Sequence, residues 1–234
     1  VLDDTVVKIR QFRKSLHFQS YSKKIDSAFL WDYFRLDDDL PRIYSRIKKD
    51  RHVSQAVEKF HGLRLMRQDP WECLISYICA TNKNIPAIRD MISNMCRRFG
   101  KKTHAQVREF YTFPKPDDLA EASLKELRLC KLGFRAERVK ATSERVSSGG
   151  FNLEALKTLP YERAKKELMT LPGVGPKVAD CVLLFSLEKL EAFPIDVWMK
   201  RITLEYYTRH FEPFFVEKVT NIVRKMCSFS FSQF

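Results

Sequence analysis

A lysine directly follows a glycine-bracketed turn between two helical patterns, in the stretch Leu171–Asp180, which reads LPGVGPKVAD. Pro176 suits the first position of a helix, so Lys177 would lie in the first helical turn. There the positive end of the helix dipole and partial burial both favour the neutral amine. A neutral amine attacks electrophilic carbon and forms a Schiff base, whereas an ordinary surface lysine stays protonated. This segment by itself is equally compatible with a lysine whose amine simply reaches solvent.

A carboxylate can return to this lysine. A helix over 176–188 extends about 20 Å, and the residues 189–195, if extended, span about 23 Å. Asp196 precedes the helical pattern that begins at Val197, so it also fits a helix N-cap, a setting that keeps a carboxylate ionised. Capping and a place beside the lysine are compatible roles. The sequence therefore predicts Lys177 and Asp196 as the reactive pair.

The turn before the lysine has the composition of an anion-binding element. Gly173 and Gly175 permit positive φ angles and close approach of another backbone. Backbone N–H groups of the turn and of the following helix can then point at a phosphate. Leu171 and Val174 would anchor the turn in the core, and the apolar residues 178–187 predict a buried helix. An isolated glycine pair would indicate only a tight connection, but the fuller string resembles the helix-hairpin-helix element of DNA-binding proteins.

Composition and charge narrow the possible partners. The 234 residues carry 42 lysines and arginines against 29 aspartates and glutamates, and the net charge of +13 is spread along the chain. This excess predicts a polyanionic partner. No apolar run approaches the roughly 18 residues of a membrane helix, and no leader pattern opens the chain. We expect no membrane association and an intracellular protein, in the cytoplasm or nucleoid, or in the nucleus of a eukaryote. No heptad pattern calls for oligomerisation, so a monomer is expected.

The six cysteines indicate neither disulfides nor a metal site. They lie mostly within apolar helical patterns, and none forms a C-x-x-C pair of the kind found in zinc or iron–sulfur sites. We interpret them as reduced core residues.

The elements that position these residues are mainly helical. The segments Val7–Phe12 and Leu16–Tyr21 predict a β-hairpin. Two strands cannot stand alone, so we expect this hairpin to be the remnant of an incomplete N-terminal β domain over residues 1–30. A helical domain would cover residues 31–234, with the helix-joining hairpin at 171–175. Helical periods and breaker residues predict helices near 40–59, 70–80, 84–99, 117–129, 135–148, 161–169, 176–188 and 196–209.

Several motifs occur in an order that resembles one family. They are LPGVGPK at 171–177, PIDV at 194–197, LMRQDPWECLIS at 65–76, CATNKNI at 79–85 and LGFRA at 132–136. Together they resemble the helix-hairpin-helix DNA glycosylase superfamily, in its 8-oxoguanine DNA glycosylase branch, over roughly residues 30–205. The resemblance implies two helical subdomains with the hairpin and a catalytic cleft between them. It also implies base excision repair of 8-oxoguanine in double-stranded DNA, opposite cytosine.

The same resemblance implies roles for individual residues. Lys177 would attack C1′ of the damaged nucleotide, and Asp196 would stabilise the positive charge that develops on the sugar. The Schiff base would then permit β-elimination of the 3′ phosphate, so the protein would be an N-glycosylase with lyase activity. No cofactor would be required and no iron–sulfur cluster is implied. The hairpin would contact the DNA backbone and hold a monovalent cation, through the residues Gly173, Val174 and Gly175.

Further positions match residues that contact the DNA or the damaged base in this family. Asn82 would fill the gap left by the extruded nucleotide, Phe134 would be a wedge, and Arg135 would bond the orphaned cytosine. Cys181 would line the base pocket. Trp198 stands where eukaryotic members carry a histidine near the phosphate of the lesion. Without the motifs, a turn-forming asparagine, a core phenylalanine and a helix-start arginine would be the simpler interpretations.

The C-terminus offers candidates for base stacking, and two alternative functions fit parts of the sequence. One of three C-terminal phenylalanines could stack on the flipped base, namely Phe229, Phe231 and Phe234. One alternative is an endonuclease III-like glycosylase for oxidised pyrimidines, which also uses lysine and aspartate. The missing cysteine cluster and the motif Gln68–Pro70 count against it. A second alternative is a helix-hairpin-helix DNA-binding module without catalysis, which would bind DNA but form no covalent adduct.

Overall fold

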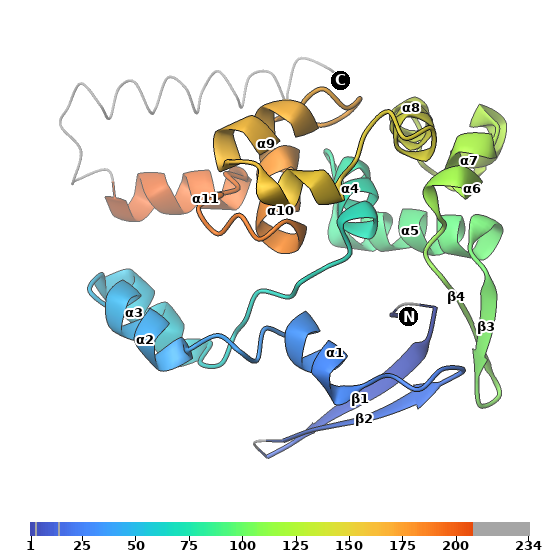
Figure 1. Ribbon diagram of the computed structural model, residues 1–234. Helices are drawn as coiled ribbons and strands as arrows, with labels where there is room; N and C mark the ends of the chain where they lie inside the picture. Colours follow the sequence, from blue (N-terminus) through green and yellow to red (C-terminus); the bar gives the residue numbers. More distant parts are fainter. Residues whose placement is uncertain (3, 14, 208–234) are drawn as a thin grey trace, which may run out of the picture. The chain divides into compact units, whose positions relative to one another are not determined.

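The structure is a computed structural model that describes residues 1–2, 4–13 and 15–207. The chain divides into two compact units. The first holds Val1–Asp38 and Arg64–Phe193, and the second holds Asp39–Leu63 and the chain from Pro194 onward. The described residues are mainly helical, with two small two-stranded sheets (Figure 1). The predicted mainly helical fold with a small N-terminal β element is confirmed.

The first unit contains two antiparallel hairpins. Strands β1 (Val6–Phe12) and β2 (Ser15–Tyr21) pair as the sequence predicts. A second hairpin of β3 (Lys102–Ala105) and β4 (Arg108–Tyr111) was not predicted. Its strands have only four residues each, and the turn places Gln106 at φ 56° without the glycine or asparagine that normally marks such a turn.

Most of the secondary structure of the first unit is helical (Figure 1). The helices are α1 (Ser27–Tyr33), α4 (Pro70–Cys79), α5 (Ile85–Phe99), α6 (Pro116–Glu121), α7 (Leu124–Leu129), α8 (Arg135–Ser147), the 3-10 helix η1 (Glu154–Thr158), α9 (Tyr161–Leu168) and α10 (Pro176–Ser186). The core lies among α4, α5, α8 and α10, where Leu74, Met95, Val139 and Leu183 are fully buried. Helix α10 is therefore the buried helix that its apolar sequence predicts.

Two of the predicted helices are each divided into two shorter ones. The predicted helix over 117–129 breaks before Ser123, whose hydroxyl accepts a hydrogen bond from the Glu126 N–H at 3.2 Å. The Glu126 carboxylate accepts one from the Ser123 N–H at 3.1 Å, which completes a capping box and starts α7. The predicted helix over 40–59 breaks at Asp50, whose carboxylate caps the N–H of Val53 at 2.8 Å.

The two helices on either side of Asp50 belong to the second unit. It contains α2 (Leu40–Ile47), α3 (Arg51–Lys59), α11 (Val197–Ile202) and the π-helical turn η2 (Thr203–Tyr207). The Tyr207 hydroxyl donates to Asp50 at 2.9 Å, and the rings of His52 and Tyr206 lie 4.5 Å apart. These contacts join α3 to η2 although about 150 residues separate them in sequence. Among the described residues, none of the helices is both long and apolar enough to cross a membrane.

Candidate active site

The glycine-bracketed hairpin connects α9 to α10 with defined geometry. The Leu171 N–H donates to the Leu168 carbonyl at 3.0 Å, and the Val174 N–H donates to the Leu171 carbonyl at 3.1 Å. Gly173 has φ +85°, in the left-handed region that favours glycine, and Gly175 caps α10 in an extended conformation. Leu171 and Val174 are buried in the core, as the sequence predicts.

One side-chain stripe of α8 supports the hairpin. The Thr142 hydroxyl, which is fully buried, donates to the Pro172 carbonyl at 3.1 Å. Arg145 donates to the Thr170 carbonyl at 2.7 Å. Arg138, one turn before Thr142, packs its aliphatic carbons against the turn. The three side chains follow one another at spacings of four and three residues, so they share one face of the helix. The hairpin is thus fixed from outside its own two helices.

Lys177 lies half-buried in the first turn of α10, beside two side chains of the core. Its Nζ is 5.1 Å from the centroid of the Tyr77 ring, which comes from α4. That ring stacks on Phe185 at a centroid distance of 5.9 Å and an interplanar angle of 9°. Cys181, one helical turn after Lys177, is buried. Burial raises the pKa of its thiol, and the positive charge of Lys177 acts in the opposite direction. Lys177 and Cys181 are therefore neighbours, with Tyr77 between α4 and α10.

The carboxylate nearest in sequence to Lys177 has a structural role. Asp180 is almost fully buried and accepts hydrogen bonds from the Tyr161 hydroxyl at 2.7 Å and from the Lys165 amine at 2.9 Å. Lys165 also donates to the Tyr161 hydroxyl at 2.8 Å. This network ties α9 to α10 on both sides of the hairpin. The charge of Asp180 is thereby neutralised by a lysine other than Lys177.

Three residues with predicted DNA contacts lie together at the ends of α4 and α8. Asn82 is exposed in the turn after α4, at φ 50°. Arg135 at the start of α8 is buried and donates to the carbonyl of Thr81, directly before Asn82. Phe134 is half exposed, with the guanidinium of Arg135 at 4.2 Å from its ring centroid. The structure thus brings Asn82, Phe134 and Arg135 into one cluster.

The second unit holds the remaining predicted residues. Asp196 accepts a hydrogen bond from the Met199 N–H at 2.8 Å, which confirms its predicted N-cap role at α11. Trp198 is exposed, and its ring lies 5.0 Å from the guanidinium carbon of Arg201. Lys177 and Asp196 belong to different compact units, so their pairing stays a prediction. The C-terminal residues predicted to stack on a base lie outside the described residues, namely Phe229, Phe231 and Phe234.

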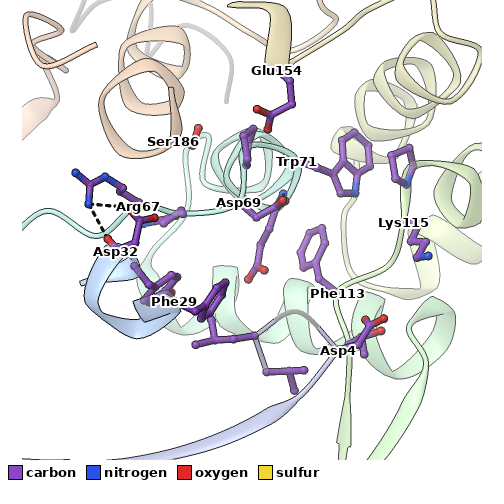
Figure 2. A pocket seen from close by; sticks show the side chains of 18 of the residues that line it. Asp4, Phe29, Asp32, Arg67, Asp69, Trp71, Phe113, Lys115, Glu154 and Ser186 are labelled. Atoms are coloured by element: carbon purple, nitrogen blue, oxygen red, sulfur yellow. Dashed lines mark hydrogen bonds and ion pairs between the residues drawn. The ribbon is translucent and has the colours of Figure 1, made fainter. Parts of the chain in front are cut away.

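A large cavity of the first unit is separate from this lysine. It has a volume of about 840 Å³, and Figure 2 shows Trp71, Phe113 and Phe29 around it. Ser186, the last residue of α10, also lines it, whereas Lys177 does not. Nine residues of helix rise by roughly 13 Å, so the cavity lies at the opposite end of α10 from Lys177. Among the described residues, no cluster of histidine, cysteine and carboxylate side chains could hold a metal ion.

Sequence reasoning missed two residues of this region. Tyr77 lies between two of the motifs that carry the family resemblance, 65–76 and 79–85, and was interpreted only as part of an apolar helix. A tyrosine on a buried helix needs a partner for its hydroxyl, and that need was the available signal. Arg138 follows Arg135 by one helical turn, and this spacing indicates a shared face.

Comparison with known proteins identifies the family. Residues 1–74 match the N-terminal domain of 8-oxoguanine DNA glycosylase, and residues 75–213 match the HhH-GPD superfamily of base excision DNA repair proteins. The chain belongs to the HhH-GPD superfamily, in its 8-oxoguanine DNA glycosylase branch. The border between the two matches falls inside α4 of this HhH-GPD chain. The predicted domain border between residues 30 and 31 stays a prediction.

Relatives of this HhH-GPD chain include curated proteins and solved structures. The N-glycosylase/DNA lyase OGG1 of Arabidopsis thaliana is 34% identical over 82% of this chain and 53% of its own length. The N-glycosylase/DNA lyase of Saccharomyces cerevisiae is 34% identical over 76% of this chain and 50% of its own length. The chain therefore spans about half the length of these two relatives. The apo structure of Clostridium acetobutylicum 8-oxoguanine glycosylase/lyase is 33% identical, with a TM-score of 0.82 over 94% of this chain and 76% of that one.

Proposed function

We propose that this protein removes 8-oxoguanine from duplex DNA and then cleaves the strand by β-elimination through a Schiff base on Lys177. The observation that carries the proposal is the place of the Lys177 amine. It is half-buried at the start of α10, directly after the hairpin and over the Tyr77 ring. The relatives support the substrate, since they include an N-glycosylase/DNA lyase and an 8-oxoguanine glycosylase/lyase, and one related structure contains duplex DNA with cytosine opposite 8-oxoguanine. We propose the same opposite base here.

The reaction begins with the extrusion of the damaged nucleotide from the stack. The lone pair of the neutral Lys177 amine forms a bond to C1′, and the electrons of the glycosidic bond leave with the base. Asp196 stabilises the positive charge that develops on the sugar. Opening of the sugar ring then gives a protonated Schiff base. Loss of a proton from C2′ breaks the C3′–O bond and releases the 3′ phosphate. Hydrolysis of the Schiff base regenerates the amine.

Other residues hold the DNA during this sequence. Cys181 borders the base pocket beside Lys177, and its buried thiol has a raised pKa, so it presents a neutral surface to the base. Asn82 fills the gap, and the exposed Phe134 acts as the wedge. Arg135 serves the orphaned cytosine. Its Nε is buried and has no hydrogen-bond partner among the described residues, so one donor of the guanidinium is unpaired. Trp198 contacts the backbone near the lesion.

The hairpin provides the backbone contact and fits a monovalent cation. Its N–H groups at Gly173 and Gly175 bind a phosphate. The Leu171 carbonyl accepts one hydrogen bond, from Val174, and a carbonyl oxygen has a second lone pair that can face an ion. Such an ion would add positive charge at the DNA backbone, and no step of the proposed reaction passes through it.

Borohydride trapping tests the proposal. The protein is incubated with duplexes that carry 8-oxoguanine opposite cytosine, 8-oxoguanine opposite adenine, thymine glycol or an abasic site. Borohydride then reduces any Schiff base to a stable protein–DNA adduct. We expect an adduct with 8-oxoguanine opposite cytosine and with the abasic site. An adduct with thymine glycol alone would support the pyrimidine glycosylase instead, and no adduct with any duplex would support a DNA-binding module.

Two variants assign the residues. Lys177→Gln should bind the duplex with unchanged affinity and form no adduct, because the nucleophile is absent. Asp196→Asn should slow base release under single-turnover conditions without unfolding the protein, since the amide keeps the N-cap acceptor. Cleavage by the Lys177→Gln variant would show that the nucleophile is another residue. Unchanged base release by Asp196→Asn would remove this residue from the reactive pair.

A further inference from the structure

Arg138 links two of the elements that the proposed function places on DNA. It lies half-buried on α8, three residues after Arg135. A β-carbon at residue 173 would lie 2.9 Å from its Cδ and 3.1 Å from its own Cβ, so the aliphatic part of Arg138 covers Gly173. Its guanidinium carbon lies 4.9 Å from the centroid of the Phe134 ring. One side chain therefore spans from the hairpin to the wedge.

The charge of this side chain is not compensated. The guanidinium of Arg135 lies against the same Phe134 ring at 4.2 Å, and burial together with the charge of Arg138 lowers the pKa of Arg135. Within the described part of the chain, neither Arg135 nor Arg138 forms an ion pair with a carboxylate. Arg128 on α7 differs, since it pairs with Glu137 at 2.7 Å. Two like charges at one ring are unfavourable until an anion joins them.

Among the described residues, the Arg138 guanidinium has no hydrogen-bond or ion-pair partner, so its donors are available. A guanidinium that stacks on a ring uses its flat face, and its N–H groups point outward in the plane of the group. Such an edge matches the two oxygens of a phosphodiester in bidentate geometry. The Arg138 stem covers Gly173 of the hairpin, so the guanidinium and the N–H groups of the hairpin can approach the same stretch of DNA backbone.

We propose that Arg138 binds a DNA phosphate between the hairpin and Phe134, and so couples the wedge to the hairpin. This inference rests on the proposed function only in requiring that the protein binds duplex DNA. Phosphate binding places the duplex against Phe134, whose ring lies close to both guanidiniums. The bound anion relieves the repulsion between Arg135 and Arg138, which leaves Arg135 able to donate to the unpaired base.

The salt dependence of DNA binding tests this inference. The probe is a labelled duplex with a tetrahydrofuran abasic analogue opposite cytosine, which binds but cannot react. Arg138→Met keeps the aliphatic stem over Gly173 and removes the charge. Because each phosphate contact contributes about 0.9 to the slope of log K against log salt concentration, we expect the slope to decrease by about one for this variant. Arg138→Lys should restore the slope, because lysine keeps the point charge.

The matched control is Arg128→Met, on the neighbouring helix α7. It removes the same charge from a side chain already paired with Glu137, so its slope should equal that of the unchanged protein. An unchanged slope for Arg138→Met, or an equal decrease for Arg128→Met, would overturn the assignment. Thermal unfolding of both variants shows whether a change in folding accounts for a difference.

The outcomes separate this inference from the proposed reaction. If borohydride traps the unchanged protein and Arg138→Met keeps the wild-type slope, the reaction stands and the phosphate contact is wrong. If trapping fails with every duplex and Arg138→Met still lowers the slope, the phosphate contact stands and the catalytic proposal is wrong.

Discussion

Replacing Gly173 and Gly175 by alanine, one at a time, should separate the folding role of the hairpin from its DNA-binding role. Gly173 has φ +85°, where an alanine costs about 1–2 kcal/mol. The new β-carbon would also lie 2.9 Å from Cδ and 3.1 Å from Cβ of Arg138, and overpacking of this kind costs about 1–3 kcal/mol. The outer carbons of Arg138 can move aside, but its Cβ is fixed to α8. We therefore expect Gly173→Ala to lower the free energy of unfolding by about 2–4 kcal/mol.

Gly175 provides the matched control. Its φ of −94° and ψ of 179° are accessible to any residue, and a β-carbon there would meet no atom within 4 Å. Alanine at this position should leave the free energy of unfolding nearly unchanged, because the restriction of the unfolded chain, worth up to about 1 kcal/mol, offsets the poorer N-cap of α10. The added methyl group would nevertheless stand at the start of α10, where the DNA backbone is proposed to approach. Duplex affinity should therefore decrease for Gly175→Ala without a loss of stability.

Urea unfolding followed by circular dichroism gives the free energies, and fluorescence anisotropy with the tetrahydrofuran duplex gives the affinities. Equal stability of the Gly173→Ala and Gly175→Ala proteins would refute the argument from φ and from the contact with Arg138. Wild-type duplex affinity of a stable Gly175→Ala protein would refute the proposed approach of the DNA backbone to the hairpin.

Three further predictions concern the surroundings of the hairpin. Tyr77→Leu should slow borohydride trapping about five-fold under single-turnover conditions, the effect of about 1 kcal/mol, because the Lys177 amine loses the ring against which it is positioned. Tyr77→Phe should keep the wild-type rate, and equal rates for all three proteins would exclude a positioning role for the ring. Asp180→Ala should lower the free energy of unfolding in urea by about 2–3 kcal/mol, because it leaves the partly exposed Lys165 without its carboxylate; a loss below about 0.5 kcal/mol would contradict this. Contacts with Ser123 and Arg98 lower the pKa of Glu126 to about 2, so its stabilising contribution is present above the unfolded pKa of about 4.3 and is lost as the pH falls toward 2. The stability difference between the unchanged protein and Glu126→Gln should therefore disappear near pH 2, and a difference that persists there would be inconsistent with this pKa.

Long helices could be predicted from their apolar periodicity, whereas short elements and breaks within a periodic stretch were missed. Capping residues mark the start of α7 at Ser123 and the break at Asp50. The helical periodicity continues across both positions, so each pair of helices was predicted as one. The hairpin of β3 and β4 has no comparable signal, because its four-residue strands and its turn at Gln106 lack glycine, asparagine and long alternation. Helix α1 (Ser27–Tyr33) was also missed, since seven residues are too few to establish a helical period.

The candidate site shows the same division. Lys177 and the hairpin could be predicted because their spacing is local and their residue types are restrictive. Tyr77 and Thr142 could not, because their roles depend on contacts between segments 100 and 30 residues apart in sequence. A tyrosine or threonine in an apolar helix is more often a core residue than part of a site, so the need of the Tyr77 hydroxyl for a partner does not by itself identify a site.

The contacts that hold the hairpin and Lys177 help to distinguish a glycosylase from a DNA-binding module. The contacts from α8 fix the hairpin, and either kind of protein needs them to present N–H groups to a phosphate. The contacts around α10 are different. Asp180 ties this helix to α9 through Lys165, and Tyr77 meets the Lys177 amine from α4. A module that only binds phosphate gains little from a lysine held half-buried over an aromatic ring, since an exposed amine would serve it better. A nucleophile must instead be held at one place against a carbon atom, to which it forms a bond. The position of Lys177 is therefore better explained by covalent chemistry than by DNA binding alone.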